Sequence, residues 1–500
     1  MATTAITEKA AARSKTASRM RSLKDVSGFD LYYQLVYMAA TASAGIDRSH
    51  VFEMASHLPR STAIYFRKVH VLARKLGYDY ARACRLLGEA VRSDSMKSLL
   101  LRLADTLVSG QPEMDFLSEE AAVQGLVYEK EYERDLTSLT KWTDAYGAII
   151  VSTALIIIVN LVSTMIYNLG LSIIIGLVVL AVFTALGGTW VLTRAAPDEV
   201  RDVFSSEGPW SQQWALRLVK ITAPVLLIVT ALMAVLSVPL GWILMVNAIL
   251  LLPLGITSLL GGREITTKDR EIGPFLRSLG ATAISTGTTL TEAMNRLDLS
   301  SFSALQPDLE RLRYRLRASI DPDLCWQKFA LETGSKLIHE TIRVFIDAAN
   351  LGGDADIVGL RAAEFANRTI MLRAKREVVT STFVSMTLVI HAAVAALMTI
   401  IMEVMTKFIE MIWSAAVIEG EQALEAMVLP LPSLDDPQMI FLQYVTTAMV
   451  LLLAVTNAVA LGATDVGHKL RVSFYLSLLL FISGLAFVLA PPLIGAIMQV

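Results

Sequence analysis

The sequence predicts an all-α, polytopic membrane protein with about seven transmembrane helices and two homologous cytoplasmic helical-bundle modules. Its 500 residues are 54% hydrophobic, which is too apolar for a soluble enzyme of this length. Several apolar runs each have the roughly 20 residues that a helix needs to cross the hydrocarbon core. A polar stretch near the start also resembles a later one at a constant offset, which indicates a duplicated unit.

Four glycines mark the duplication. Gly45 and Gly287 end matching short Thr/Ser/Ala-rich stretches, and Gly110 and Gly352 end two further matching stretches. Both pairs are separated by 242 residues, and a spacing kept without net insertion is typical of a repeated supersecondary unit. We interpret the four as structural repeat markers that fix helix ends. The same shift superimposes two pairs of acidic residues, Asp79 on Asp321 and Asp105 on Asp347.

The polar segments are predicted to be cytosolic. Residues 1–27 are rich in Ala, Ser, Thr, Lys and Arg and are expected to form a disordered basic tail, weakly attracted to anionic lipid. Their composition also resembles an organellar transit peptide, which we consider the weaker interpretation. Residues 28–146 and 261–380 are expected to form the first and second helical modules. In each module the last helix runs into a span without a breaker, at about 119–146 and 355–380.

The apolar segments predict seven spans. Residues 147–260 would hold four transmembrane helices as two tight hairpins, turning at Asn168 and at Pro239 to Gly241. Residues 381–500 would hold three more, with an acidic external loop at 403–439. The expected spans are 147–167, 169–192, 221–240, 241–260, 381–402, 440–461 and 473–498.

Charge predicts the orientation of the spans. Basic residues concentrate at 193–220, 261–380 and 462–472, and lysine and arginine near membrane ends are retained inside the cell. The segment 403–439 carries seven acidic residues against Lys407 alone. We therefore expect a cell-membrane protein whose N-terminus is cytoplasmic and whose C-terminus is external.

The sequence lacks the usual signs of an enzyme. No glycine is followed by lysine, so there is no phosphate-binding loop, and His339-Glu340 is followed by Arg343 where a zinc-protease helix needs histidine. We expect no enzymatic activity, no cofactor and no metal. Cys84 and Cys325 do not match under the repeat shift and are interpreted as small buried residues.

A few polar residues lie within the spans. Asn160, Asn247, His391 and Asn457 are best explained by hydrogen bonds between helices, with His391 the only candidate proton carrier. Ser483 has no nucleophile-elbow context. Asp465 has no partner aspartate in another span, so intramembrane proteolysis is disfavoured.

Basic residues decorate both modules. A run from Arg60 to Arg85 covers consecutive helices of the first module, and four arginines lie within seven residues of the second. The alternative is an ordinary solvated face, interleaved with acids such as Glu310. Nucleic acid is not expected, because no aromatic interleaving is present. An acidic cytosolic protein, helped by anionic lipid, fits better. The chosen docking residues are Arg67, Arg74, Arg82, Arg311, Arg315 and Arg317.

The two modules with their glycine-marked turns, each leading through a polar helix into a span, resemble the platform proteins of type II secretion and type IV pili. This is the GspF/TadC family, and the additional spans are similar to its archaeal branch, which serves the archaellum and archaeal adhesion pili. The resemblance covers about 28–167 and 273–402.

The resemblance implies a non-enzymatic platform at the base of a filament machine. It would couple a hexameric secretion ATPase to the extraction and assembly of pilin or archaellin subunits. A hexameric motor suggests a symmetric homodimer, with a trimer as the alternative. The denser arginine cluster makes the second module the preferred docking site. A multi-span transporter or permease subunit is the rival hypothesis, and it predicts inverted repeats of the spans themselves.

Overall fold

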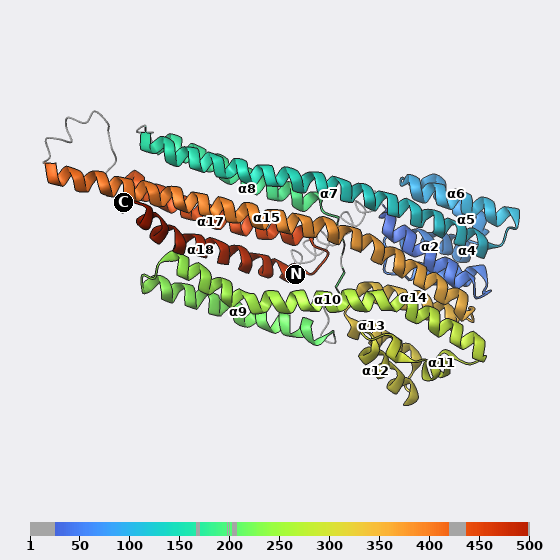
Figure 1. Cartoon of the computed structure of the whole chain (residues 1–500). Helices are drawn as coiled ribbons and strands as arrows, with labels where there is room; N and C mark the ends of the chain where they lie inside the picture. The colour runs from blue at the N-terminus through green and yellow to red at the C-terminus, as the bar shows by residue number, and fades with distance from the viewer. Residues whose placement is uncertain are drawn as a thin grey trace, which may run out of the picture. The chain divides into compact units, whose positions relative to one another are not determined.

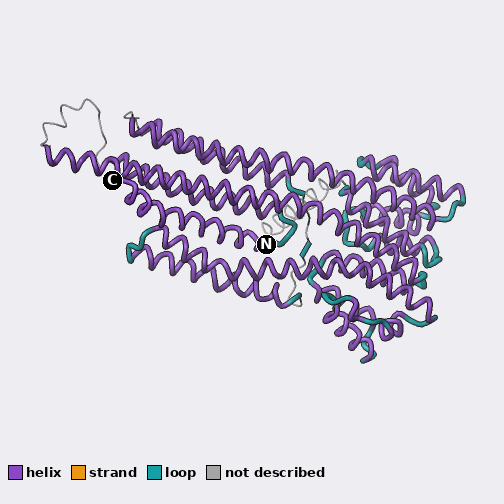
Figure 2. The backbone as a smooth tube through the Cα atoms, viewed as in Figure 1, coloured by secondary structure: helices purple, strands orange, loops and turns teal. Residues whose placement is uncertain are grey.

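The computed structural model describes residues 26–166, 171–197, 199, 201–202, 208–419 and 437–498. Within these ranges every regular element is a helix (Figure 2). Seven of the described helices are long and apolar enough to cross a membrane. The predicted fold class, an all-α polytopic membrane protein, is therefore confirmed.

The chain folds into two compact units (Figure 1). Unit 1 comprises Met1–Glu133 with Thr266–Leu372, and unit 2 comprises Arg134–Ile265 with Arg373–Val500. The module limits expected at 146, 260 and 380 each lie inside one continuous helix. Three helices contribute residues to both units: α7 (Glu113–Ile166), α10 (Leu240–Thr286) and α15 (Ala355–Glu419).

Unit 1 holds both copies of the repeat. Besides parts of the three long helices, the first copy contains five helices: α2 (Gly28–Ala42), α3 (Arg48–Ser56), α4 (Ala63–Leu76), α5 (Tyr80–Ala90) and α6 (Asp94–Ser109). The second copy contains α11 (Leu290–Arg296), η2 (Leu299–Ser301), α12 (Gln306–Arg317), α13 (Pro322–Thr333) and α14 (Lys336–Asn350).

Helix boundaries in the two copies correspond closely. After a shift of 242 residues, the starts of α3, α5, α6 and α7 coincide with those of α11, α13, α14 and α15. Asp79 and Asp321 both cap the following helix, Asp79 accepting one backbone N–H and Asp321 accepting two. All four marker glycines have positive φ, a left-handed conformation that costs a side chain roughly 1–2 kcal/mol.

The two copies share one hydrophobic core within unit 1. The α2 helix packs against α14 of the other copy. The hydroxyl of Tyr37 donates to Asp347 at 2.7 Å, and Phe29 packs against Phe365 with ring centroids 6.0 Å apart. Burial raises the pKa of the Asp347 carboxyl, and the hydrogen bond from Tyr37 opposes that shift only in part.

Unit 2 contains the apolar helices. Its remaining members are α8 (Leu171–Ala195), α9 (Trp210–Val235), α17 (Pro437–Thr464), η3 (Lys469–Arg471) and α18 (Val472–Met498). The predicted turn at Asn168 lies outside the described residues. Residues 403–419 belong to α15, so the first part of the expected external loop is helical, and 420–436 lie outside the description.

Small residues let α10 approach α18 closely. Gly241, Ala248 and Gly255 recur every seven residues along α10. A Cβ at Gly241 would lie 2.9 Å from the Gly484 carbonyl oxygen, and one at Gly255 would lie 2.6 Å from the Cα of Phe474. Such contact through small residues is a common way for helices to associate in lipid.

Candidate functional site

Six predicted docking arginines lie on helices of unit 1, three in each copy of the repeat. In the first copy, α4 buries Tyr65, Phe66 and Val69, which leaves its basic residues on the opposite, exposed side. The resulting surface on α4 and α5 is called the first basic face. Its members are Arg67, Lys68, Arg74, Lys75 and Arg82.

The first basic face retains most of its charge. Within the described ranges, no salt bridge involves Arg67, Lys68, Arg74 or Lys75. Arg82 stacks over Tyr78, with the guanidinium carbon 5.4 Å from the ring centroid. Arg74 and Lys75 lie in the last turn of α4, where the helix dipole favours positive charge. They therefore also stabilise the end of this helix.

The arginines of the second copy are already engaged. Arg311 forms salt bridges with Asp308 and with Glu332, the latter at 3.3 Å. Arg315 pairs with the same Glu332, and Arg317 donates to the side-chain oxygen of Asn295 at 2.7 Å. The denser cluster therefore has less charge to offer a partner than the first basic face. The sequence-based preference for the second copy as the docking site rested on counting arginines without their partners.

Arg60 does not belong to the basic surface in which the sequence placed it. Its side chain is 11% exposed and pairs with Asp30 at 3.0 Å and with Glu340 of the other copy. The guanidinium also lies over the rings of Phe29 and Tyr33. Arg60 therefore joins the two copies, because Asp30 and Glu340 come from different halves of the repeat.

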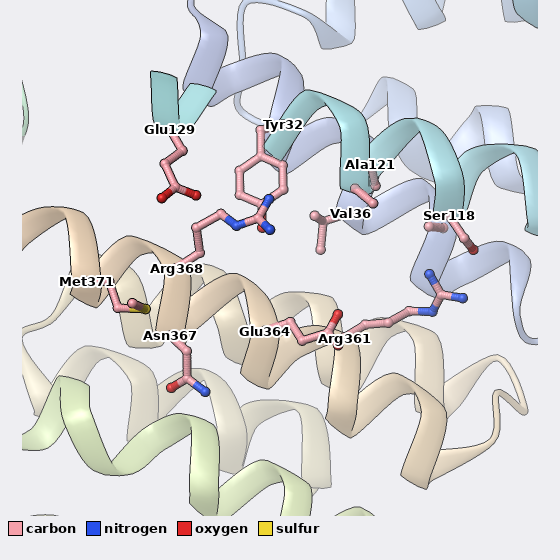
Figure 3. A pocket seen from close by; sticks show the side chains of 12 residues that line it. Tyr32, Val36, Ser118, Ala121, Glu129, Arg361, Glu364, Asn367, Arg368 and Met371 are labelled. Carbon is pink, nitrogen blue, oxygen red and sulfur yellow. The ribbon is translucent and has the colours of Figure 1, made fainter. Parts of the chain in front are cut away.

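A cavity of about 540 Å³ lies between α2, α7 and α15 in unit 1 (Figure 3). Its volume falls in the range of roughly 300–1,000 Å³ that is usual for ligand sites. The guanidinium carbon of Arg368 lies over the Tyr32 ring, 5.7 Å from its centroid. Burial raises the pKa of the Tyr32 hydroxyl to about 12. Gly125 makes this stacking possible, because a Cβ there would come within 2.8 Å of the Tyr32 ring.

Two of the polar residues of the spans, His391 and Asn457, belong to a hydrogen-bond network inside unit 2. Tyr146 donates to Asn457 at 2.9 Å, and the Asn457 amide lies 3.2 Å from one ring nitrogen of His391. The other ring nitrogen lies 2.9 Å from the hydroxyl of Ser483, which donates onward to the Leu479 carbonyl at 3.0 Å. The network thus joins helices α7, α15, α17 and α18.

A serine beside a histidine that an amide orients resembles a hydrolytic triad in outline. Here Ser483 and Asn457 are fully buried, and His391 is 1% exposed. The serine hydroxyl is committed to a helix carbonyl, so it is not positioned to attack a substrate. The network therefore supports the interpretation of these residues as links between helices. Asn247 likewise accepts a hydrogen bond from Thr230 at 3.0 Å.

The sequence analysis did not anticipate a role for Arg376, which lies near the predicted cytoplasmic end of a span. Arg376 is 2% exposed and donates to the carbonyls of Pro197, Ala463, Thr464 and Asp465, so it caps the end of α17. The only sequence signal was an arginine a few residues before a span, which is also typical of an ordinary membrane boundary.

Among the described residues, no cluster of His, Cys, Asp or Glu is placed to hold a metal ion. Both cysteines are buried and unpaired, in agreement with the interpretation from the sequence.

Comparison with known proteins gives a family match for the second copy of the repeat. Residues 275–403 match the family Type II secretion system (T2SS), protein F, and this segment begins in α10 and ends in α15. No solved structure matches the chain.

Two similar proteins carry the name Flagella accessory protein J. That of Methanocaldococcus jannaschii is 24% identical over 427 residues, which cover 83% of this chain and 74% of that protein. That of Methanococcus voltae is 24% identical over 306 residues, covering 58% of this chain and 54% of that protein. This multi-pass membrane chain therefore contains a type II secretion system protein F domain at 275–403, which confirms the family resemblance seen in its sequence.

Proposed function

We propose that the chain is the membrane platform of an archaeal type IV filament machine, either an archaellum or a pilus. It would couple a cytosolic, hexameric secretion ATPase to the extraction and assembly of filament subunits, without enzymatic activity of its own. The match of residues 275–403 to the protein F family carries this proposal, supported by the similarity to the flagella accessory J proteins.

The continuous helices provide a physical route for coupling. Helices α7 and α15 occupy corresponding positions in the two copies, and each contributes to both units without a break. A displacement imposed on unit 1 by a motor would be passed along these helices, because an α-helix resists axial compression through its ladder of hydrogen bonds. Filament subunits would then be lifted from the bilayer by movements of unit 2.

The first basic face is our preferred docking surface for the motor. Its exposed charges lack salt bridges with described residues, whereas Arg311 and Arg315 share Glu332. Long-range attraction depends on net charge, so the unpaired face would steer an acidic partner more strongly. A dimeric platform would present two such faces to a hexamer.

Charge substitution in each copy tests this assignment. The variant Arg67→Glu/Arg74→Glu/Arg82→Glu should abolish binding of the secretion ATPase and filament assembly. In the comparison variant, Arg311 and Arg315 are changed to Gln, and binding should fall by less than about threefold because both arginines already pair with carboxylates. Binding is measured by pull-down of the purified ATPase on the full chain, and filaments are counted on cells.

Two results would count against the proposal. Normal ATPase binding and filament assembly in the first variant, with the protein folded and in the membrane, would remove the docking assignment. Normal filaments in cells that lack the whole chain would remove the platform function itself.

A further inference from the structure

The cavity in unit 1 arises from an asymmetry between the two exit helices. On α7 it is lined by the small side chains of Ser118, Ala121 and Ala122, whereas α15 contributes Arg361 and Arg368. Ala122 and Glu364 are equivalent under the repeat shift, so the cavity lies where the corresponding helices of the two copies face each other. Small residues on one side leave a groove that a symmetric pair of large side chains would fill.

The two arginines lie at opposite ends of this groove. They are seven residues apart on α15, about 10 Å along a helix axis. Figure 3 shows Arg361 extending toward Ser118 and the Arg368 guanidinium beside Tyr32, with Glu129 on the same side as Arg368. The charge at the Arg368 end is therefore balanced locally, by an aromatic ring and a nearby carboxylate.

Arg361 is different. Within the described ranges it forms no hydrogen bond or salt bridge, and its Nε atom is buried without a partner. Burial lowers the pKa of this guanidinium, although Glu364 and Asp115 oppose that effect from a distance. A buried donor without an acceptor is costly, and a carboxylate is the acceptor that a guanidinium binds best.

The α2 side of the groove is apolar, where Val36 and Ala39 line it. On α15, Glu364 and Asn367 line the groove between the two arginines, and Met371 lies beyond Arg368. A ligand that fits would therefore carry a carboxylate next to an apolar side chain, which is the chemistry of an acidic peptide. The groove opens to solvent, so a chain segment can enter without unfolding the unit.

We propose that this groove binds an acidic peptide segment of a cytosolic partner, with a carboxylate held by Arg361 and a neighbouring apolar side chain packed on Val36 and Ala39. Because α7 and α15 both line the groove, an occupant would bridge the exit helices of the two copies and hold their separation. The groove is distinct from the first basic face, which lies on α4 and α5.

A pair of defined probes tests the proposal. The full chain in nanodiscs of zwitterionic lipid is titrated against a fluorescein-labelled octapeptide of alternating Glu and Leu. The counterpart peptide has Lys in place of every Glu, and empty nanodiscs give the background. Fluorescence anisotropy should show saturable binding of the acidic peptide only. Arg361→Gln should raise its Kd at least about tenfold, because a charge-assisted hydrogen bond is lost.

Two further variants locate the binding. Ala122→Trp adds bulk at an exposed position of the groove and should abolish binding without changing charge. Arg67→Gln/Arg74→Gln removes charge from the first basic face and should leave the Kd within about twofold. The proposal is overturned by equal affinity for Arg361→Gln and the unaltered chain, by equal binding of the lysine peptide, or by the absence of saturable binding. None of these outcomes bears on ATPase docking, which is read from the first basic face.

Discussion

The arginines of this chain have three different roles, and their surroundings decide which. Arg67 is exposed on α4 and is free to attract a partner. Arg60 is enclosed by two carboxylates and two aromatic rings and joins the copies of the repeat. Arg376 is buried against helix carbonyls and caps α17. Substitutions of the same residue type should therefore have very different consequences.

Replacing Arg60 with alanine should destabilise unit 1 by about 3 kcal/mol, because it removes the guanidinium that pairs with two poorly exposed carboxylates, Asp30 and Glu340. The free energy is measured by urea titration of the full chain in detergent. Trp326 is the one tryptophan within unit 1 and reports its unfolding, with the other tryptophans replaced by phenylalanine.

Arg67→Ala is the control for that measurement. Its side chain is exposed, so the free energy of unfolding should change by less than about 0.5 kcal/mol. Equal effects of the two substitutions would mean that the ion pairs of Arg60 do not hold the copies together.

At the scale of helices, packing depends on where small residues fall. In unit 1, Gly280 of α10 would place a Cβ within 2.2 Å of the Ala355 carbonyl oxygen, so this helix meets the start of α15 backbone to backbone. In unit 2, the small residues at intervals of seven bring the same helix against α18. One helix thus makes close backbone contacts in both units, and neither contact tolerates a larger side chain.

Gly255→Leu should disrupt the contact between α10 and α18, because even a Cβ would overlap the backbone at Phe474. Overpacking of this kind typically costs about 1–3 kcal/mol. The matched control is Gly187→Leu on α8, where nothing lies within 4 Å of the added Cβ. The melting temperature of the purified chain in detergent should fall for the first variant only. It is measured by size-exclusion chromatography of samples heated to increasing temperatures. Similar melting of both would show that this contact does not support the bundle.

At the scale of the whole molecule, the distribution of charge predicts how the chain crosses the membrane. The seven candidate spans among the described residues are an odd number, which predicts chain ends on opposite sides of the membrane. The basic segments 193–220 and 462–472 and the acidic segment 403–439 then fall on opposite sides as well. Both copies of the repeat lie in unit 1, which fits the expectation from charge that they share one side of the membrane.

A reporter fused after Val500 should be external. Alkaline phosphatase at this position should be active and green fluorescent protein dark, whereas the same reporters fused before residue 28 should give the opposite pattern. Cytoplasmic activity at the C-terminal fusion would reverse the orientation, and the basic modules could not then meet a cytosolic motor.

Much of this protein was predictable from local sequence. The seven apolar helices follow from composition over about 20 residues, and the repeat follows from glycines that end helices through their own backbone freedom. Asp79 and Asp321 cap the helices that begin next to them, so their roles were within reach of a comparison between the copies. The long helices were expected where no breaker interrupts the path into a span.

Only the tertiary structure decided which charges remain available and where a groove opens. Arg60 meets Glu340 across 280 residues of sequence, and Tyr146 meets Asn457 across 311. Glu332 pairs with two arginines of another helix, which a count of charges along the chain does not show. The groove beside Arg361 exists because small residues of one copy face large residues of the other. Local sequence determines a helix because its hydrogen bonds span four residues, whereas the partner of a side chain depends on how distant helices pack.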